Sequence, residues 1–382
     1  MANTLSIILL ESDTRTAGEI VTILKTLGDA IGMIRVAAEI QELVRVIPSG
    51  EPHIVLLEVK EIEQGVKDTD FLISQFPQTT VIVIASEKTP DWILRLIRAG
   101  ASEYLTKPVI AAELTDAIKN VTRLRMQNNS EPASTNGTVI SMYNPSGGVG
   151  TTTIAVNLAA TLAASGNNVV LVDLNLFNGD VTAFLDLTPR YTLSSVTYRQ
   201  GHIDASFLRS VIVMHPSGLQ ILSAPIDIGE ADEITPGQIR EVIAVLKKIF
   251  TYIIIDTGGE LFGCNLAAFG SSERILFVTV LNLPALRNAK KYLAAMNNEG
   301  LGPDKVKLII NRQTPKDDIK VADAEKVLGC KAYLSVPNAY LDVKTSINKG
   351  EPLVTSNPRS PVAKAMENLA RQVVQEAAGG SR

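Results

Sequence analysis

Residues 145–153 combine glycines with hydroxyl side chains in a pattern that suits phosphate chemistry. They read Pro-Ser-Gly-Gly-Val-Gly-Thr-Thr-Thr and stand between an apolar run and a helical pattern. Gly147, Gly148 and Gly150 let the backbone bend until successive N–H groups surround an anion, and the following helix adds the positive end of its dipole. Thr152, at the start of that helix, has a hydroxyl suited to Mg²⁺ coordination. The pattern therefore predicts a phosphate-binding loop.

Three other apolar runs end in polar side chains. Asp173 closes Leu-Val-Asp, Asp256 closes Ile-Ile-Ile-Asp as a Walker B strand does, and Asn311 closes Ile-Asn. In open parallel sheets, ligands bind outside the carboxyl ends of the strands. We therefore expect these three residues and the loop to form one site. The alternative is a structural turn flanked by ordinary helix caps.

The elements that must position these residues fall into two domains. The chain has 382 residues, which is enough for two or three domains of ordinary size. Residues 127–137 are polar, contain proline and glycine and lack large apolar side chains. We interpret them as a linker between domains at 1–126 and 138–382.

In the first domain, β-branched or leucine-rich runs alternate with amphipathic segments. Strands are expected at 5–10, 31–36, 53–59, 80–85 and 103–105. Helices are expected at 14–27, 40–47, 70–76, 90–99 and 109–125. This alternation predicts a doubly wound parallel-sheet domain of the (βα)5 kind.

The second domain repeats the alternation on a larger scale. Strands are expected at 138–143, 168–173, 219–223, 252–256, 274–280 and 305–311. Helices are expected at 152–165, 236–250, 284–298, 318–328 and 361–378. The fold class is therefore α/β throughout, with a second and larger parallel sheet. With its phosphate-binding loop, this second domain resembles a P-loop NTPase.

Composition limits the other classes of function. Lysine plus arginine total 36 and aspartate plus glutamate total 40, so the net charge of −4 does not favour DNA or anionic membrane. Residues 287–349 hold 12 basic and 7 acidic residues, an excess of 12 − 7 = 5, but the charges are spread out as on a solvated surface. Cys264 and Cys330 are far apart, which indicates buried thiols in a reducing compartment. No signal peptide or membrane anchor is evident, and we expect a cytoplasmic protein.

The second domain resembles the deviant Walker A ATPases, the MinD/ParA group, whose loop reads approximately G-K-G-G-x-G-K-[ST]-[ST]. Ser146 stands where that family has its signature lysine, and Thr151 stands where it has the phosphate-binding lysine. Asn175 replaces the second acid of the family's Asp-x-Asp, whereas Asp173 and Asp256 are retained. The resemblance implies hydrolysis that is very weak or absent, with Ser146, Thr151 and Asn175 as degenerate catalytic positions.

The same resemblance implies an ATP site with Mg²⁺. Asn311 would contact the adenine, Pro337 and Asn338 would flank the base, and Thr152 and Asp256 would hold the metal. The other residues implied to bind nucleotide are Gly147, Gly148, Val149, Gly150, Thr151, Thr153 and Asp173. From the residues alone, Asn311 could instead cap local backbone, and Pro337 with Asn338 could form a plain turn.

The first domain resembles a response-regulator receiver. Its clearest match is Ala-Gly-Ala-Ser-Glu-Tyr-Leu-Thr-Lys-Pro at 99–108, in which Lys107 occupies the place of the lysine that pairs with the phosphoryl group. The family's acidic pair reads Glu11-Ser12-Asp13 here, and Glu58 stands in place of the phosphoacceptor aspartate. We expect a vestigial site in which Glu58 can pair with Lys107, rather than a working phospho-switch.

The two domains together resemble the CpaE/TadZ family of pilus-assembly proteins. Further similar stretches are 283–290, 310–312, 336–338 and 347–353, followed by Ser-Pro at 360–361. The resemblance implies a homodimeric, ATP-binding localisation scaffold for type IVb (Flp/Tad) pilus assembly at a cell pole, with other pilus-assembly proteins as partners. On the composition described above, we expect neither a membrane anchor nor nucleic-acid binding.

Other functions remain open at this point. One alternative is an active MinD/ParA-like ATPase that cycles on membrane or nucleoid, although the segment 363–378 has few basic residues for membrane binding. Another is an interaction scaffold that does not depend on nucleotide. A transcriptional response regulator fits poorly, because no helix-turn-helix pattern follows the receiver-like domain.

Overall fold

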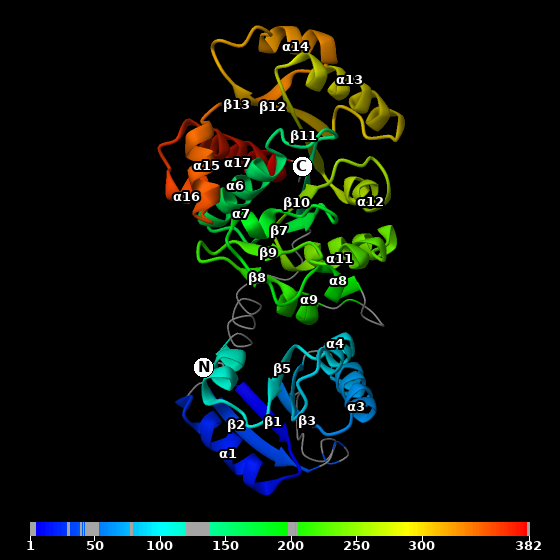
Figure 1. Ribbon diagram of the computed structural model, residues 1–382, viewed down its shortest axis with the longest axis vertical. Coiled ribbons are helices and arrows are strands. Elements are labelled where there is room, and N and C mark those ends of the chain that lie inside the picture. The colour runs from blue at the N-terminus through cyan, green and yellow to red at the C-terminus, as the bar shows by residue number, and fades with distance from the viewer. Residues whose placement is uncertain are drawn as a thin grey trace. The chain divides into compact units, whose positions relative to one another are not determined.

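The computed structural model of the protein describes residues 5–28, 31–38, 40, 42, 53–76, 79–119, 137–197, 203 and 205–379. The chain divides into two compact units (Figure 1). One unit comprises Met1–Ala133 with Tyr198–Val211, and the other comprises Ser134–Thr197 with Ile212–Arg382. The expected linker 127–137 lies outside the described residues apart from Gly137, so the boundaries at 126 and 138 remain a prediction.

The first unit contains a five-stranded parallel sheet in the order β2-β1-β3-β4-β5. Its strands are β1 (Leu5–Leu10), β2 (Ile31–Ala37), β3 (Ile54–Val59), β4 (Thr80–Ala85) and β5 (Glu103–Thr106). Its described helices are α1 (Thr14–Lys25), α3 (Ile62–Gln75), α4 (Pro90–Arg98) and α9 (Ala205–Val211), and residues 111–119 are also helical. The expected helix at 40–47 falls almost entirely outside the described residues.

Helices cover both faces of this sheet because its strands are apolar on both sides. Ile7 and Leu9 pack on one face with α1 and with Leu114, on the helical segment 111–119. Helices α3 and α4 lie together on the opposite side of the sheet from α1 (Figure 1). Helix α3 begins eight residues before the expected start at 70, across Gly65. A Cβ at Gly65 would lie 2.4 Å from Cγ1 of Val59, so this glycine permits close packing inside a helix.

The second unit contains an eight-stranded sheet in the order β13-β12-β11-β6-β10-β7-β9-β8. All neighbouring strands are parallel except β8, which is antiparallel to β9. The strands are β6 (Thr138–Tyr143), β7 (Val169–Leu174), β8 (Val213–Met214), β9 (Gln220–Leu222), β10 (Tyr252–Thr257), β11 (Arg274–Val280), β12 (Val306–Gln313) and β13 (Ala332–Pro337). The sequence pattern missed β8 and β13, which lie at the two edges of this sheet.

Two groups of helices enclose this second sheet. Helices α6 (Thr151–Ala164) and α17 (Pro361–Gly379) share one apolar core, whereas α12 (Gly263–Ser271) and α13 (Leu283–Asn298) contribute to another on the opposite face (Figure 1). The longer remaining helices are α11 (Pro236–Ile249), α14 (Val321–Leu328) and α15 (Tyr340–Asn348). The short ones are α7 (Val181–Phe184), α8 (Leu193–Thr197), α10 (Ile228–Asp232) and α16 (Leu353–Ser356).

Two further expectations concern the protein's environment. Among the described residues, no helix has the length and apolar character needed to cross a membrane. Cys264 and Cys330 are free thiols that are half-buried, rather than buried as expected. Each lies on or beside a helix that packs only one side against the core, which leaves part of the side chain accessible.

Candidate functional site

The glycine loop joins β6 to α6 in left-handed backbone conformations. Gly147, Gly148 and Gly150 have φ angles of 63°, 66° and 98°, and Gly150 is the N-cap of α6. Side chains with a Cβ rarely adopt these angles, so the glycines are needed for the course of the chain. Such turns form anion-binding concavities at the positive end of a helix. The local geometry therefore suits a phosphate group.

Two asparagines hold the start of the loop. The Asn144 side chain donates to the Val278 carbonyl (2.5 Å) and accepts from the Ser146 amide (2.6 Å). Asn288, on α13, donates to the Ser146 hydroxyl (3.2 Å). The position that resembles the signature-lysine site is thus occupied by a short, locally anchored hydroxyl.

Asn311 holds the end of the loop. Its Nδ2 donates to the Val149 carbonyl (2.7 Å), and its Oδ1 accepts from the Arg312 amide (2.9 Å). A Cβ at Gly150 would lie 2.4 Å from this Nδ2, so the side chain packs directly on the loop backbone. Both polar atoms of Asn311 therefore have partners within the protein. Its contact with adenine stays a prediction, and the role in bracing the loop was not evident from the sequence.

Two buried carboxylates lie next to each other at the ends of β7 and β10. Asp173 and Asp256 are opposite each other in the strand register, and each is 1% exposed. Burial raises the pKa of Asp173 well above its usual value, and the neighbouring charge of Asp256 adds to this. Backbone amides of Asn175 (3.2 Å) and Val181 (3.1 Å) donate to Asp173 and oppose the shift.

Asp256 is the carboxylate whose surroundings best suit metal binding. Burial raises its pKa to about 7, a hydrogen bond with the Thr152 side chain opposes this, and the charge of Asp180 reinforces it. Its Oδ1 is buried without a hydrogen-bond partner among the described residues. A buried carboxylate oxygen without a partner is costly, and a bound cation would satisfy it.

Asn175 presents an amide where the resemblance implies an acid in active relatives. Its Nδ2 donates to the Asn178 carbonyl (2.8 Å). A Cβ at Gly258 would lie 3.2 Å from its Oδ1, so the side chain also packs close to the chain after β10. This amide is therefore held in place, but it brings no negative charge to the site.

These elements surround a cavity of about 590 Å³, a size typical of cofactor sites. The predicted residues that line it are Gly147, Gly148, Gly150, Thr151, Thr152, Thr153, Asn175, Asn311, Pro337 and Asn338. The sequence interpretation gave no site role to four charged residues that line the cavity, namely Asp180, Glu260, Arg312 and Lys344. Asp180 and Glu260 follow strand ends, a signal that could have identified them.

Several predicted residues do not line this cavity. Val149 is 6% exposed and packs into the core, so its part in the loop is played by its backbone. Ser146 faces Asn288 outside the cavity lining, and Asp173 and Asp256 lie buried behind the surface of the cavity.

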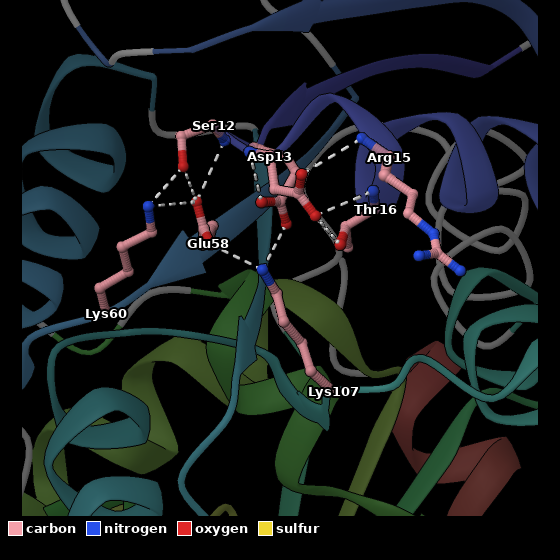
Figure 2. Close-up of polar contacts among 8 residues, drawn as sticks. Ser12, Asp13, Arg15, Thr16, Glu58, Lys60 and Lys107 are labelled. Carbon is pink, nitrogen blue, oxygen red and sulfur yellow. Dashed lines mark hydrogen bonds and ion pairs between the residues drawn. The ribbon is translucent and has the colours of Figure 1, made fainter.

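The first unit has a second cluster of polar residues at the ends of its strands (Figure 2). Lys107 Nζ lies 2.6 Å from Glu58 Oε1 and 2.7 Å from Glu11 Oε2. Ser12 donates to Glu58 Oε2 through its hydroxyl (2.7 Å) and its amide (3.1 Å). Lys60 Nζ in turn donates to the Ser12 hydroxyl (2.5 Å). The glutamate at the phosphoacceptor position is therefore fully engaged.

Asp13 contributes its backbone amide to this cluster, by donating to Glu11 Oε1 (3.0 Å), whereas its side chain caps a helix. It is the N-cap of α1 and accepts from the amides of Arg15 (3.3 Å) and Thr16 (3.2 Å) (Figure 2). Hydrogen bonds from Thr16 hold the pKa of Asp13 below its usual value. This residue thus has an ordinary structural reason to be acidic.

The ion pairs make the first cluster self-neutralising. Burial favours the protonated form of Glu58, but hydrogen bonds from Lys107 and Ser12 lower its pKa to about 2. Burial raises the pKa of Glu11, although its bond with Lys107 opposes this. Burial works against the charge of Lys107, yet its two carboxylate partners raise the pKa of that lysine. Lys107, the lysine expected to pair with a phosphoryl group, is therefore already paired with Glu58 and Glu11.

Known protein families match both parts of the chain. Residues 7–119 match the response regulator receiver domain, and residues 137–298 match the AAA domain. The septum site-determining protein MinD of Thermotoga maritima is 29% identical over 244 residues, which cover 62% of this chain and 88% of that protein.

Solved structures show the same fold for the second domain. The cell division ATPase MinD of Pyrococcus furiosus is 26% identical, with a TM-score of 0.55, over 63% of this chain and 99% of that one. A ParA family ATPase from Chlorobium tepidum is 22% identical, with a TM-score of 0.58, over 61% and 98%. The chain therefore contains a receiver-like domain and a larger P-loop NTPase domain that resembles MinD and ParA, and the predicted fold class is confirmed.

Proposed function

We propose that the MinD/ParA-like domain binds ATP with Mg²⁺, hydrolyses it very weakly or not at all, and serves as a dimeric scaffold. The observation that supports this most directly is the cavity itself. It combines a glycine loop at a helix N-terminus with the Thr152 hydroxyl, next to the buried carboxylate of Asp256, but the loop has no lysine. Such a site can hold phosphates through backbone amides.

The residues beside the loop fit a magnesium ion. Mg²⁺ prefers oxygen ligands, and Thr152 and Asp256 offer a hydroxyl and a carboxylate. The unpartnered Oδ1 of Asp256 is the atom that would gain most from a cation. When bound, Mg²⁺ would neutralise phosphate charge, while Thr152 and Asp256 would orient it.

Weak hydrolysis follows from the charges that are absent. Turnover needs positive charge at the γ-phosphate and an oriented water. Ser146 and Thr151 provide no positive charge, and the Asn175 amide is bonded to the Asn178 carbonyl. Loss of one charge-assisted hydrogen bond removes about 1.5–3 kcal/mol, so binding should be micromolar or weaker.

Titration calorimetry of the full chain with ATP and millimolar Mg²⁺ tests this function. We expect saturable binding that weakens when Mg²⁺ is withdrawn. A Thr152→Val variant should lose the Mg²⁺ dependence, whereas Thr235→Val, at the N-cap of α11, should keep it. If the wild-type protein binds no ATP, the proposed function is wrong. The alternative, an interaction scaffold that does not depend on nucleotide, then remains.

We further propose that the scaffold places type IVb (Flp/Tad) pilus-assembly proteins at a cell pole, within the cytoplasm. The support is the resemblance to the CpaE/TadZ family, in which a receiver with a decayed phosphoacceptor site joins a lysine-poor MinD-like domain. Deleting the gene should abolish these pili, and a fluorescent fusion should form a polar focus. A diffuse fusion that still restores pili would contradict the polar role.

A further inference from the structure

The nucleotide cavity contains positive charge that the glycine loop does not provide. Residues 144–153 include no lysine or arginine. Among the described residues that line the cavity, the basic ones are Arg312 and Lys344. Because triphosphate binding without any cationic side chain would leave charge uncompensated, these two residues are the candidates to complement it.

Arg312 has an unusual backbone conformation, and it lies at an irregularity in the pairing of β12 with β13. Its φ angle is 57°, and Asp186 is the other residue besides glycine with a positive φ in the described part of the chain. Ile310 pairs with Ser335 and Gln313 pairs with Pro337, so β12 advances three residues over a stretch in which β13 advances two. This is a β-bulge, a feature that re-aims side chains next to functional sites.

The bulge is tied to the phosphate loop. The Arg312 amide donates to Asn311 Oδ1 (2.9 Å), and Asn311 Nδ2 donates to the Val149 carbonyl (2.7 Å). The arginine therefore stands two hydrogen bonds away from the loop backbone, just before the first turn of α6. Its side chain is exposed, lines the cavity and forms no ion pair with another described residue.

Lys344 lies in different surroundings. It belongs to α15, whose Val343 and Ile347 give the cavity an apolar wall beside Pro337 and Asn338. Apolar walls of this kind suit a nucleobase rather than phosphates. Lys344 also lacks any connection to the loop comparable to that of Arg312.

We propose that the Arg312 guanidinium binds the phosphates of a nucleoside di- or triphosphate and provides the positive charge that Ser146 and Thr151 do not. This inference rests on the proposed function, that the cavity binds ATP. Arginine presents a rigid fork of donors that matches phosphate oxygens in pairs. The bulge fixes the backbone from which this side chain extends, so ligand binding has to order the side chain but not the chain around it.

Calorimetry of the full chain with ATP, ADP and adenosine, each with Mg²⁺, tests the inference. Arg312→Gln keeps the length of the side chain and removes its charge. It should weaken ATP and ADP binding roughly 10- to 100-fold and adenosine binding less than about 2-fold. Arg312→Lys should recover part of the loss. Arg240→Gln, an exposed residue of α11 outside the cavity, is the matched control and should bind as the wild type does.

The possible outcomes separate the inference from the function on which it rests. Wild-type binding of ATP with an unaffected Arg312→Gln variant would overturn the inference and leave the proposed function standing. Equal losses for ATP and adenosine, or a loss confined to Lys344→Gln, would also overturn it. If the wild type binds no nucleotide, both fail. Thermal melting of each variant shows whether the fold persists. ATP affinity that is higher in Arg312→Lys than in Arg312→Gln supports the role of the positive charge.

Discussion

At the scale of single residues, both polar clusters keep the positions of a functional site while changing the charges. Glu58 and Lys107 form a closed ion pair, and Ser12 fills a position where receivers have an acid. In the second domain, Ser146, Thr151 and Asn175 are neutral where active relatives of the resembled group are charged. We therefore expect both sites to keep a geometry suited to binding while lacking charges that drive chemistry.

ATP turnover is the first consequence of these neutral residues. We expect the wild-type protein to hydrolyse ATP at close to the background rate. Ser146→Lys, Thr151→Lys and Asn175→Asp together should raise the rate, because they restore charge at the γ-phosphate and an acid for the water. A phosphate-release assay measures this. Asp180→Asn added to the triple variant shows whether the neighbouring acid contributes. Wild-type turnover typical of ordinary ATPases would contradict the prediction.

The receiver cluster should resist phosphorylation. Acetyl phosphate should leave Glu58 unmodified, and beryllofluoride should not change the fluorescence of Trp92, the one tryptophan of the chain and a residue of α4. The reason is that Lys107 is already paired with Glu58 and Glu11, and a carboxylate with a strongly lowered pKa is held in place by its donors. Mass spectrometry of residues 1–125 checks this, and a stable phospho-adduct there would show the interpretation to be wrong.

The same ion pair should make the first domain sensitive to acid. The folded-state pKa of Glu58 is about 2, below the ordinary 4.5, so its stabilisation is complete above pH 4.5 and is lost as the pH falls towards 2. Glu58→Gln should lower the free energy of unfolding at pH 7 by about 1–2 kcal/mol and flatten this part of the pH profile. Urea unfolding followed by Trp92 fluorescence measures it. Glu19→Gln, on the exposed surface of α1, is the control, and equal profiles for all three proteins would refute the prediction.

At the scale of elements, the glycine loop and the end of β12 work as one unit. Gly150 combines a φ of 98° with direct packing against Asn311. Gly300 has a φ of 77°, but no atom within 4 Å of the place where a Cβ would be. A substitution at Gly300 therefore introduces backbone strain alone, whereas one at Gly150 introduces both strain and a steric clash.

Gly150→Ala should abolish nucleotide binding and destabilise the second domain by about 2–3 kcal/mol, since strain and clash add. Gly300→Ala should cost about 1 kcal/mol and leave binding intact. Calorimetry with ATP and thermal melting measure the two effects. Wild-type affinity in Gly150→Ala would show that the loop does not depend on its contact with Asn311.

At the scale of the whole molecule, we expect a homodimer formed mainly by the second domain. Exposed apolar side chains follow three of its strand ends, namely Phe262 (69% exposed), Leu283 (74%) and Leu341 (74%). Exposed apolar residues gathered at one edge of a sheet favour association. Ser146 cannot reach a partner's nucleotide as a lysine would, so the dimer should persist without ATP.

Light scattering tests this assembly. Deleting residues 1–130 should leave the dimer largely intact but impair partner recruitment. Phe262→Asp with Leu283→Asp should produce monomers, whereas Val327→Asp, an exposed residue of α14, should not. A monomeric wild-type protein across the micromolar range, with and without ATP, would contradict the dimeric scaffold.

The amino-acid sequence determined those features that depend on short-range sterics and local patterning. Apolar runs alternating with amphipathic segments predicted both parallel sheets, and the glycines predicted the left-handed loop. The same local rules failed where context overrides them. The helix at 70–76 was expected too short, because α3 begins at Ile62 and the missing side chain of Gly65 is what allows it to pack on Val59. Edge strand β13 was missed because half-buried residues interrupt its apolar pattern.

Only the tertiary structure showed which hydrogen bonds hold the phosphate loop and which charged side chains surround the cavity. Asn311 braces Val149 across 162 residues of sequence, and no local pattern encodes a contact at that separation. The bulge at Arg312 arises from pairing between β12 and β13, so a cation in the cavity could not be predicted from the loop motif. The raised pKa of Asp256 likewise requires complete burial, which only the packed sheet and helices provide. Short-range sterics act along the chain, whereas desolvation and distant hydrogen bonds exist only after the chain has folded.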